Sequence, residues 1–312
     1  MSEQQPIQAI LLGLALGDAL GWPIEFLSLQ KIHTIYGPDG IQQPPDPALV
    51  TDDTQMTIAI GEALVEAGEA DLDTLMEAVT RRLIAWSNSP ENDRAPGHTV
   101  TEAIRTLEAG SSWRESGNAI AEGCGSAIRV APIGYLNQHD PERLREVAHA
   151  VGLITHAHPS AQAAAIAAAY LVKLALDGVP PDEYLPRTLE FTTGISDEFR
   201  DTMLRIEHVS QWADELAAIM YIGNGWVGRE TVAMAVYCAM RYPDDYPGAV
   251  RRAVNIPGDS DSVGCITGGL VAARLGLDAI PADWIARLEH RDTLTDLAER
   301  LADKKRSLYG AS

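Results

Sequence analysis

Residues 161–176 read A-Q-A-A-A-I-A-A-A-Y-L-V-K-L-A-L, the most continuous apolar run in the chain. Alanine is the strongest helix former, and it lets neighbouring backbones pack closely. The run contains Gln162 and Lys173 and is too short to span a bilayer. We therefore predict a helix in the protein core rather than a membrane-spanning helix. Only 6% of the residues are aromatic, so the core must consist mainly of Ala, Leu, Ile and Val. Such a core suits closely packed helices.

The same periodicity recurs along the chain. Apolar residues follow one another at three- and four-residue spacing, and the strict alternation of a half-buried strand is almost missing, so the predicted fold class is all-α. Asp140 before Pro141, and Ser196, are typical helix N-caps. We predict helices at 6–20, 54–68, 71–87, 99–109, 141–155, 160–177, 182–192, 197–208, 212–221, 229–241, 246–255, 261–275, 281–289 and 291–307.

The domain organisation is simple. No stretch resembles a linker, no low-complexity tail is present, and no repeat recurs at a fixed period of about 20–50 residues. We therefore expect residues 1–312 to form a single domain. We also expect it to act as a monomer.

Charge and cysteine content restrict the partners and the compartment. The formal net charge of −20 opposes binding to nucleic-acid backbones and to anionic membranes, so we expect neither partner. An acidic protein that handles a phosphate substrate needs local positive charge, which bound cations can supply. The three cysteines lie far apart without C-x-x-C spacing, and the N-terminus lacks a basic region before its apolar stretch. These features predict a cytoplasmic protein.

Two acidic motifs each stand at the start of a predicted helix. T-D-D-T occupies 51–54, and G-D-S-D-S occupies 258–262. Helix capping alone explains one or two of these residues, because Thr and Asp are good N-caps. It explains adjacent carboxylates flanked by hydroxyls less readily, and such oxygen-rich sets are what Mg²⁺ and Mn²⁺ require. An EF-hand loop is excluded because the residues after Ser262 are apolar.

The two motifs lie about 200 residues apart, and a compact bundle could bring them face to face. Two cations held there would polarise a substrate oxygen pair and lower the pKa of a bound water. Upstream, Gly13, Gly17 and Gly21 recur every four residues and would give a helix a smooth face for packing. Glu25 follows among apolar residues, where a carboxylate has a raised pKa and can shuttle protons, although a surface glutamate is the alternative.

Together these motifs resemble those of the ADP-ribosylglycohydrolases, a family that includes the dinitrogenase-reductase-activating glycohydrolases and the ADP-ribosyl-acceptor hydrolases. The resemblance spans nearly the whole chain. Its motifs are G-D-A-L-G-W-P-I-E at 17–25, T-D-D-T at 51–54, C-G-S-A-I-R-V-A-P-I-G at 124–134, I-T-H-A-H-P at 154–159, G-N-G-W-V-G-R-E-T at 223–231 and G-D-S-D-S at 258–262.

The resemblance implies a compact orthogonal multi-helix bundle with two divalent cations, Mg²⁺ or Mn²⁺, in a cleft. It implies catalytic roles for Glu25, Asp52 and Asp261, with Glu25 acting as a base or as an exchangeable ligand. The implied metal ligands are Thr51, Asp52, Asp53, Asp259, Asp261 and Ser262. The implied substrate-binding residues are Gly123, Gly125 and Ser126 in a phosphate loop, His156, and Gly223, Asn224, Gly225 and Trp226 beside the nucleotide.

From the residues alone, a turn, a core histidine and a core tryptophan remain the alternatives for the loop at 123–129, His156 and Trp226. The chain departs from the family pattern at Ser260 and Ser262, where many members carry Thr, and at Pro257, where glycine is common. These differences bear on metal preference and on acceptor specificity.

The implied activity is hydrolysis of the bond between ADP-ribose and an acceptor. The acceptor we expect is arginine on an ADP-ribosylated protein, with O-linked conjugates of serine or acetate as the alternative. A non-catalytic ADP-ribose-binding relative, and a two-metal phosphoesterase that releases AMP, are the rival interpretations.

Overall fold

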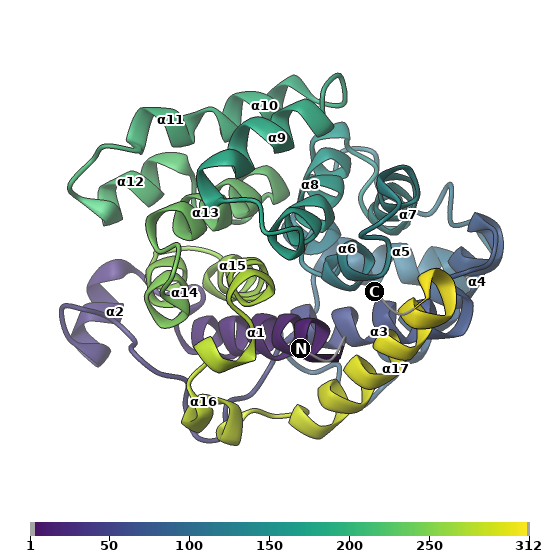
Figure 1. Cartoon of the computed structure of the whole chain (residues 1–312), viewed down its shortest axis with the longest axis horizontal. Coiled ribbons are helices and arrows are strands. Elements are labelled where there is room, and N and C mark those ends of the chain that lie inside the picture. The colour runs from purple at the N-terminus through teal and green to yellow at the C-terminus, as the bar shows by residue number, and fades with distance from the viewer. Residues whose placement is uncertain (1–3, 311–312) are drawn as a thin grey trace.

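The computed structural model describes residues 4–310, and these form an all-α assembly without any strand (Figure 1). The long helices are α1 (Gln4–Gly21), α3 (Asp52–Ala67), α4 (Leu72–Ser87), α5 (His98–Glu108), α7 (Pro141–Leu153), α8 (Pro159–Leu176), α13 (Gly228–Arg241), α15 (Ser260–Leu275) and α17 (Arg291–Tyr309). The shorter ones are α2 (Leu29–Tyr36), α6 (Ala131–Leu136), α9 (Tyr184–Phe191), α10 (Asp197–Met203), α11 (Arg205–Val209), α12 (Glu215–Ile222), α14 (Tyr246–Val254) and α16 (Ala282–Arg287). The predicted fold class is confirmed.

The helix predictions hold with three corrections. The segment 197–208 is not one helix, because the helix is interrupted at Leu204, which is the C-cap of α10 and the N-cap of α11. The sequence pattern also missed α2 and α6. The α6 segment contains Pro132 and Gly134, which normally interrupt helices, but here Pro132 lies in the first turn, where it has no hydrogen bond to lose. Both predicted caps are present: Asp140 accepts from the Arg143 N–H and Ser196 from the Phe199 N–H.

The centre of the molecule is the contact between α1 and α15, which lie side by side in Figure 1. Gly17 faces Gly264 so closely that a Cβ atom built on Gly17 would lie 2.0 Å from the Gly264 carbonyl oxygen. A Cβ on Gly21 would likewise lie 2.5 Å from Asp261 Cα. The smooth glycine face predicted from the sequence is therefore present. It brings the C-terminal end of α1 against the acidic N-terminal end of α15.

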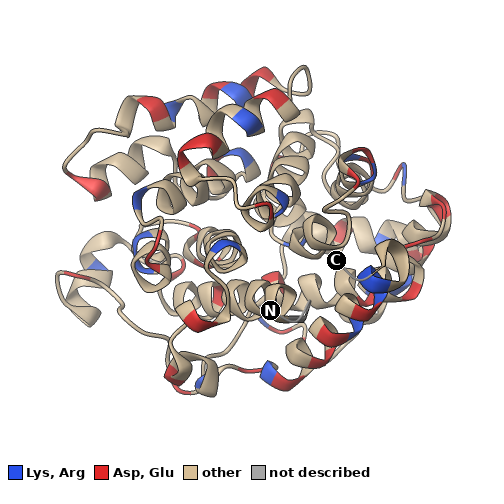
Figure 2. Cartoon of the chain, in the orientation of Figure 1, with Lys and Arg blue, Asp and Glu red and all other residues tan. Residues whose placement is uncertain are grey.

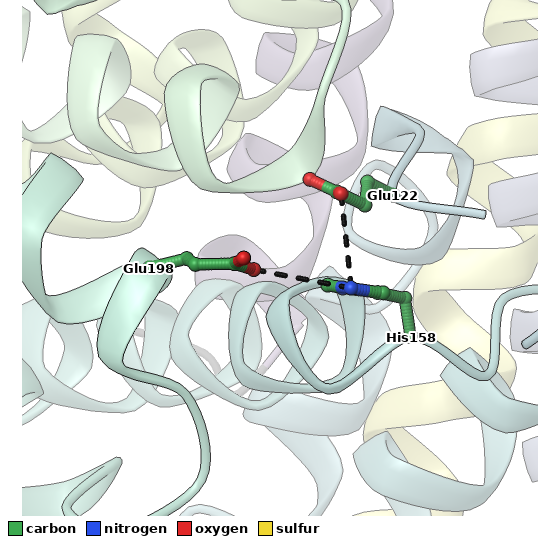
Figure 3. Close-up of side chains that lie close together, drawn as sticks. All are labelled: Glu122, His158 and Glu198. Atoms are coloured by element: carbon green, nitrogen blue, oxygen red, sulfur yellow. Dashed lines mark ion pairs between the residues drawn. The ribbon is translucent and has the colours of Figure 1, made fainter. Parts of the chain in front are cut away.

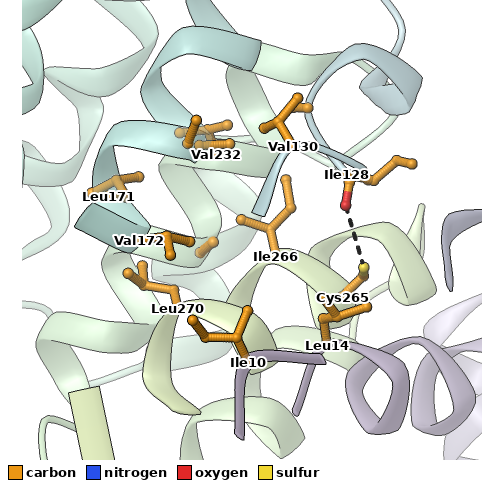
Figure 4. Close-up of a cluster of buried hydrophobic side chains, with 14 of the residues drawn as sticks. Ile10, Leu14, Ile128, Val130, Leu171, Val172, Val232, Cys265, Ile266 and Leu270 are labelled. Carbon is orange, nitrogen blue, oxygen red and sulfur yellow. Dashed lines mark hydrogen bonds between the residues drawn. The ribbon is translucent and has the colours of Figure 1, made fainter. Parts of the chain in front are cut away.

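Aliphatic side chains fill the core on the far side of α15. Figure 4 shows Ile10 and Leu14 of α1 beside Ile266 and Leu270 of α15, with Leu171 of α8 opposite. By length and hydropathy two described helical stretches, Gln5–Ile24 and Pro159–Leu176, could cross a membrane. Of these windows 83% and 78% are buried inside the protein, which is the behaviour of core helices.

Charged side chains mark the outer elements. Figure 2 shows Asp and Glu spread over the peripheral helices, with Lys and Arg among them on α17. Several form ion pairs between helices, such as Arg300 of α17 with Glu62 of α3. The acidic excess is thus largely a solvated surface, and the buried carboxylates described next are a separate group.

Candidate functional site

The first acidic motif is held in place by a buried aspartate of α1. Asp18 is fully buried and accepts hydrogen bonds from the backbone N–H groups of Thr51 at 3.0 Å and Thr54 at 3.2 Å, and from the Thr54 hydroxyl. Thr51 is the N-cap of α3, and its hydroxyl accepts from the Asp53 N–H at 3.3 Å. Because these bonds satisfy the free N–H groups of the first turn, Asp52 and Asp53 do not have to cap the helix. Their carboxylates are left for another role.

The second motif begins α15. Asp259 is the N-cap residue by position, but its side chain makes no capping hydrogen bond. Instead its carboxylate accepts the Cys124 thiol at 2.9 Å, and the Ser262 hydroxyl lies 3.4 Å from the same sulfur. The simple capping explanation for Asp259 therefore fails. Single carboxylate oxygens of Glu25, Asp259 and Asp261 lie within 4.8 Å of one another, a spacing that suits a shared cation.

Both motifs open into one cleft of about 480 Å³. Its lining includes Glu25 together with Asp52, Asp53, Asp259, Asp261 and Ser262 from the two motifs. Two of the buried oxygens, Glu25 Oε2 and Asp53 Oδ2, have no hydrogen-bond partner and belong to residues that line the cleft, so they could accept a cation or a donor there.

The electrostatics of the cleft point the same way. Burial is the main factor that raises the pKa of Glu25 to about 8, with further contributions from the charges of Asp259 and Asp18. Burial and the neighbouring carboxylates also raise the pKa values of Asp52, Asp53 and Asp261 well above the usual aspartate range. Among residues 4–310 no salt bridge joins any of these carboxylates to a basic side chain. Such a cluster is costly unless cations neutralise it.

The turn Cys124–Ser126, with His156 packed against it, continues the cleft lining from the second motif, which Cys124 contacts. Cβ atoms built on Gly123 and Gly125 would each lie 3.0 Å from the His156 ring, so a larger residue at either position would push the ring by a few tenths of an ångström. The internal bond of the turn, Ala127 N–H to the Cys124 carbonyl at 2.7 Å, leaves the first N–H groups of the turn without an acceptor inside it. The antiparallel bridge between Gly123 and Val227 engages the Cys124 N–H, so the Gly125 N–H is the group of this turn left to bind an anion.

His156 is held as a neutral hydrogen-bond donor. Its Nδ1 lies 2.8 Å from the Thr155 hydroxyl, and that hydroxyl also accepts from the fully buried Arg129 at 2.7 Å. Arg129 can only donate to the Thr155 hydroxyl, which leaves the hydroxyl proton free to point at Nδ1, and we infer from this arrangement the tautomer that carries its proton on Nε2. Burial, assisted by the charge of Arg129, lowers the pKa of His156 to about 3. The cleft-lining nitrogen is therefore an N–H donor at neutral pH.

The loop between α12 and α13 lies against the second motif. Glu230 of α13 accepts from the N–H groups of Asn224 at 3.0 Å and Gly225 at 3.3 Å. The Asp259 N–H in turn donates to the Asn224 carbonyl at 2.9 Å. Trp226 at the end of this loop is 38% exposed and lines the cleft, so the core-packing alternative for it is wrong.

Not every residue expected at the site lines the cleft. Thr51 and Ser126 are fully buried, and the Ser126 hydroxyl bonds to the Ala161 carbonyl at 3.1 Å. Gly223, Asn224 and Gly225 shape the loop behind Trp226 and lie outside the cleft lining. Gly225 has a φ of +88°, and a Cβ there would lie 3.1 Å from Asp259 Cβ.

The sequence reasoning missed three residues with clear roles. Asp18 and Arg129 are charged residues inside otherwise apolar stretches, and that mismatch is the signal that could have found them. Cys124 and Arg129 both stand in the loop predicted at 123–129, but no sequence pattern indicated their contacts. The contact of Cys124 with Asp259 bridges the glycine turn and the second acidic motif.

A second group of ligand-type side chains lies beside the cleft, where His158 Nε2 is 3.7 Å from Glu122 and 3.9 Å from Glu198 (Figure 3). Two contacts argue against a metal there. His158 Nδ1 accepts the Ser160 N–H at 3.2 Å, which places the ring proton on the nitrogen that would have to ligate. Glu122 is also ion-paired with Arg229. The group instead ties the start of α8 to α10 and α13.

The fold and the cleft agree with the comparison to known families. The family model described as ADP-ribosylglycohydrolase matches residues 2–310, so this chain belongs to the ADP-ribosylglycohydrolase family. Members of this family are ADP-ribosyl hydrolases. The resemblance inferred from the sequence motifs is confirmed.

The individual relatives share less than 30% sequence identity with this chain. An ADP-ribosylarginine hydrolase, Tri1, of Serratia proteamaculans is 27% identical, and the match covers 93% of this chain and 77% of the relative. The ADP-ribosyl-[dinitrogen reductase] glycohydrolase of Rhodospirillum rubrum is 28% identical, with 89% and 88% covered. A solved structure titled ADP-ribosylglycohydrolase-related protein complex superposes with a TM-score of 0.77 at 26% identity, and the match covers 97% of this chain and 99% of that one.

Proposed function

We propose that this protein is a two-cation hydrolase that releases ADP-ribose from arginine side chains of ADP-ribosylated proteins. The observation that carries the proposal is the convergence of two acidic helix starts, about 200 residues apart in sequence, on one cleft within a chain of this family. Asp259 makes no capping hydrogen bond, Asp261 uses one oxygen to accept the Ser262 N–H at 3.0 Å, and in residues 4–310 no salt bridge joins the carboxylates to a basic side chain.

The residues present fit two divalent cations. The unpartnered Glu25 Oε2 and Asp53 Oδ2 are oxygen donors of the kind that Mg²⁺ and Mn²⁺ select. We assign cation binding to Thr51, Asp52, Asp53, Asp259, Asp261 and Ser262, and Glu25 lies close enough to Asp259 and Asp261 to share a cation with them. When bound, the cations supply Lewis-acid polarisation of substrate oxygens and lower the pKa of water.

The protein side chains supply the remaining chemistry. The turn Cys124–Ser126 and the His156 Nε2–H group bind the pyrophosphate as hydrogen-bond donors. This places the distal ribose at the carboxylates across the cleft. As the glycosidic bond breaks, the positive charge that develops on the ribose is stabilised by these carboxylates. Water adds its hydroxyl to the anomeric carbon, Glu25 takes the water proton, and the acceptor nitrogen leaves with the bonding electrons and takes that proton from Glu25.

The choice of arginine rests on two supports. Two relatives from different bacteria are named ADP-ribosylarginine hydrolases, and they cover most of this chain. The acidic cleft also suits a cationic acceptor better than a neutral one.

The three cysteines are free, which fits the reducing cytoplasm as the site of the reaction.

The test is an ADP-ribose release assay on arginine, serine and O-acetyl conjugates, with and without a chelator. We expect metal-dependent release from the arginine conjugate, and a loss of at least about a hundredfold in Asp52→Asn and Asp261→Asn. Asp197→Asn, in the first turn of the exposed helix α10, is the matched control and should keep native activity. Full metal-dependent turnover in either cleft variant refutes the assignment. AMP among the products would identify a phosphoesterase instead.

A further inference from the structure

Two aromatic rings at the rim of the cleft have no role in the fold or in cation binding. Phe26 and Trp226 stack on each other with ring centroids 5.1 Å apart and planes 24° apart. Phe26 is 69% exposed and has a φ of +63°, a left-handed backbone that a phenylalanine rarely adopts. Both the exposure and the backbone conformation cost free energy, and such costs gather where a ligand is bound.

The pair lies at the carboxylate end of the cleft. Phe26 directly follows Glu25, and both residues line the cleft with Trp226. Trp226 follows Gly225, which is packed against Asp259. In the proposed reaction the bond that breaks lies at these carboxylates. A group held by Phe26 on this side is therefore the acceptor.

The chemistry of the pair selects one kind of acceptor. An aromatic face next to buried carboxylates favours a planar cation, and guanidinium both stacks on rings and forms cation–π contacts. Serine and acetate offer neither a plane nor a positive charge. Adenine can stack, but it carries no charge for the carboxylates to attract.

We propose that Phe26 and Trp226 form a stacking platform for the guanidinium of the arginine acceptor, so that the pair determines acceptor specificity. This proposal rests on the proposed function. It adds two residues that recognise the leaving group and do not touch the pyrophosphate.

The test compares ring-removal variants on two substrates. Phe26→Asn removes the ring while tolerating the left-handed backbone, and Trp226→Leu removes the partner. We expect kcat/KM for an ADP-ribosylarginine peptide to fall about two- to fivefold in each variant, the size of an exposed cation–π contact. In Phe26→Asn the kcat/KM for an ADP-ribosylserine peptide, and the calorimetric Kd for ADP-ribose, should not change, and in Trp226→Leu the loss on the arginine peptide should exceed the loss on the serine peptide.

Two further variants serve as controls. Phe26→Tyr keeps the ring and should retain native kcat/KM on the arginine peptide. Trp212→Leu removes a tryptophan that is 39% exposed, against 38% for Trp226, but lies outside the cleft lining, and it should have no effect.

Several results would overturn the proposal. An equal loss on both peptides, or weaker ADP-ribose binding, would assign the rings to the base or to the shape of the cleft. Release from serine but not from arginine would also refute it. If the native protein releases ADP-ribose from neither peptide, the proposed hydrolase function is refuted, but the stacking platform is not yet tested. The Kd values of the two intact conjugates then test the platform. The platform is refuted if the arginine conjugate binds no more tightly than the serine conjugate.

Discussion

Replacing Gly17 by Ala should damage both stability and activity, because Gly17 sets the distance between α1 and α15. The new Cβ would lie 2.0 Å from the Gly264 carbonyl oxygen, whereas ordinary contacts begin at 3.4 Å, so the gap must widen by about 1.4 Å (3.4 − 2.0). Both partners are backbone, so no flexible side chain can move aside. Alanine gains about 0.5–1 kcal/mol in helix propensity, but overpacking costs about 1–3 kcal/mol or more. We expect a net loss of about 2 kcal/mol.

The functional consequence is larger. A shift of about 1 Å in catalytic groups can cost about a hundredfold in rate, and this shift separates Glu25 from Asp261. Urea unfolding and kcat/KM for ADP-ribosylarginine measure the two effects. The control is Gly269→Ala in α15, whose Cβ would lie 3.3 Å from Leu14 Cβ and 3.9 Å, an ordinary contact, from the Ile10 carbonyl oxygen. It should stay within about 1 kcal/mol of the native protein and keep its activity. A Gly17→Ala variant with native stability and native turnover would refute this account of the interface.

Three further outcomes follow from the cleft. Mg²⁺ at about a hundred times its Kd should stabilise the chelator-treated protein by about 2.7 kcal/mol, and Asp261→Ala should lose most of that gain in thermal melts; an equal gain in both speaks against cation binding by this cluster. Burial depresses the pKa of His156 to about 3, so the unfolded chain binds its proton first and stability falls as the pH drops below about 6.5. Between pH 7 and pH 5 the native protein should therefore lose about 2 kcal/mol more than His156→Gln in urea unfolding, and parallel losses would contradict a buried neutral ring. Thr155→Val should shift the ¹⁵N resonances of the His156 ring towards a mixture of tautomers and raise KM, whereas Thr155→Ser should restore both; unchanged resonances in the valine variant would exclude the hydrogen-bond relay.

Much of the helical framework could be predicted from the sequence, because local periodicity and caps determine it. The caps at Asp140 and Ser196 are examples. The break at Leu204 could not be predicted, since the apolar pattern continues across it and only tertiary packing separates α10 from α11. Helix α6 could not be predicted either, because Gly134 in it looks like a helix breaker. Glycine is needed there because a Cβ would lie 2.2 Å from the Ala169 carbonyl oxygen of α8, a contact that no local sequence pattern encodes.

For the site, the motifs predicted which residue types would matter, but not how they are supported. Asp52 and Asp261 stood out because helix capping explains one or two such residues at a helix start, but not a cluster of carboxylates flanked by hydroxyls. Asp18 stands 33 residues before Thr51, and only the folded chain shows the hydrogen bonds that join them. The same holds for the contact of Arg129 with Thr155, which gives His156 its tautomer.

The central claim is that the two acidic helix starts hold a pair of divalent cations. An anomalous difference map from a crystal grown with Mn²⁺ tests it most directly. We predict two peaks in the cleft, coordinated by carboxylates of Asp52 and Asp53 from α3 and of Asp259 and Asp261 at α15. An empty cleft at saturating Mn²⁺, or a peak only at Glu122, His158 and Glu198, would contradict the claim.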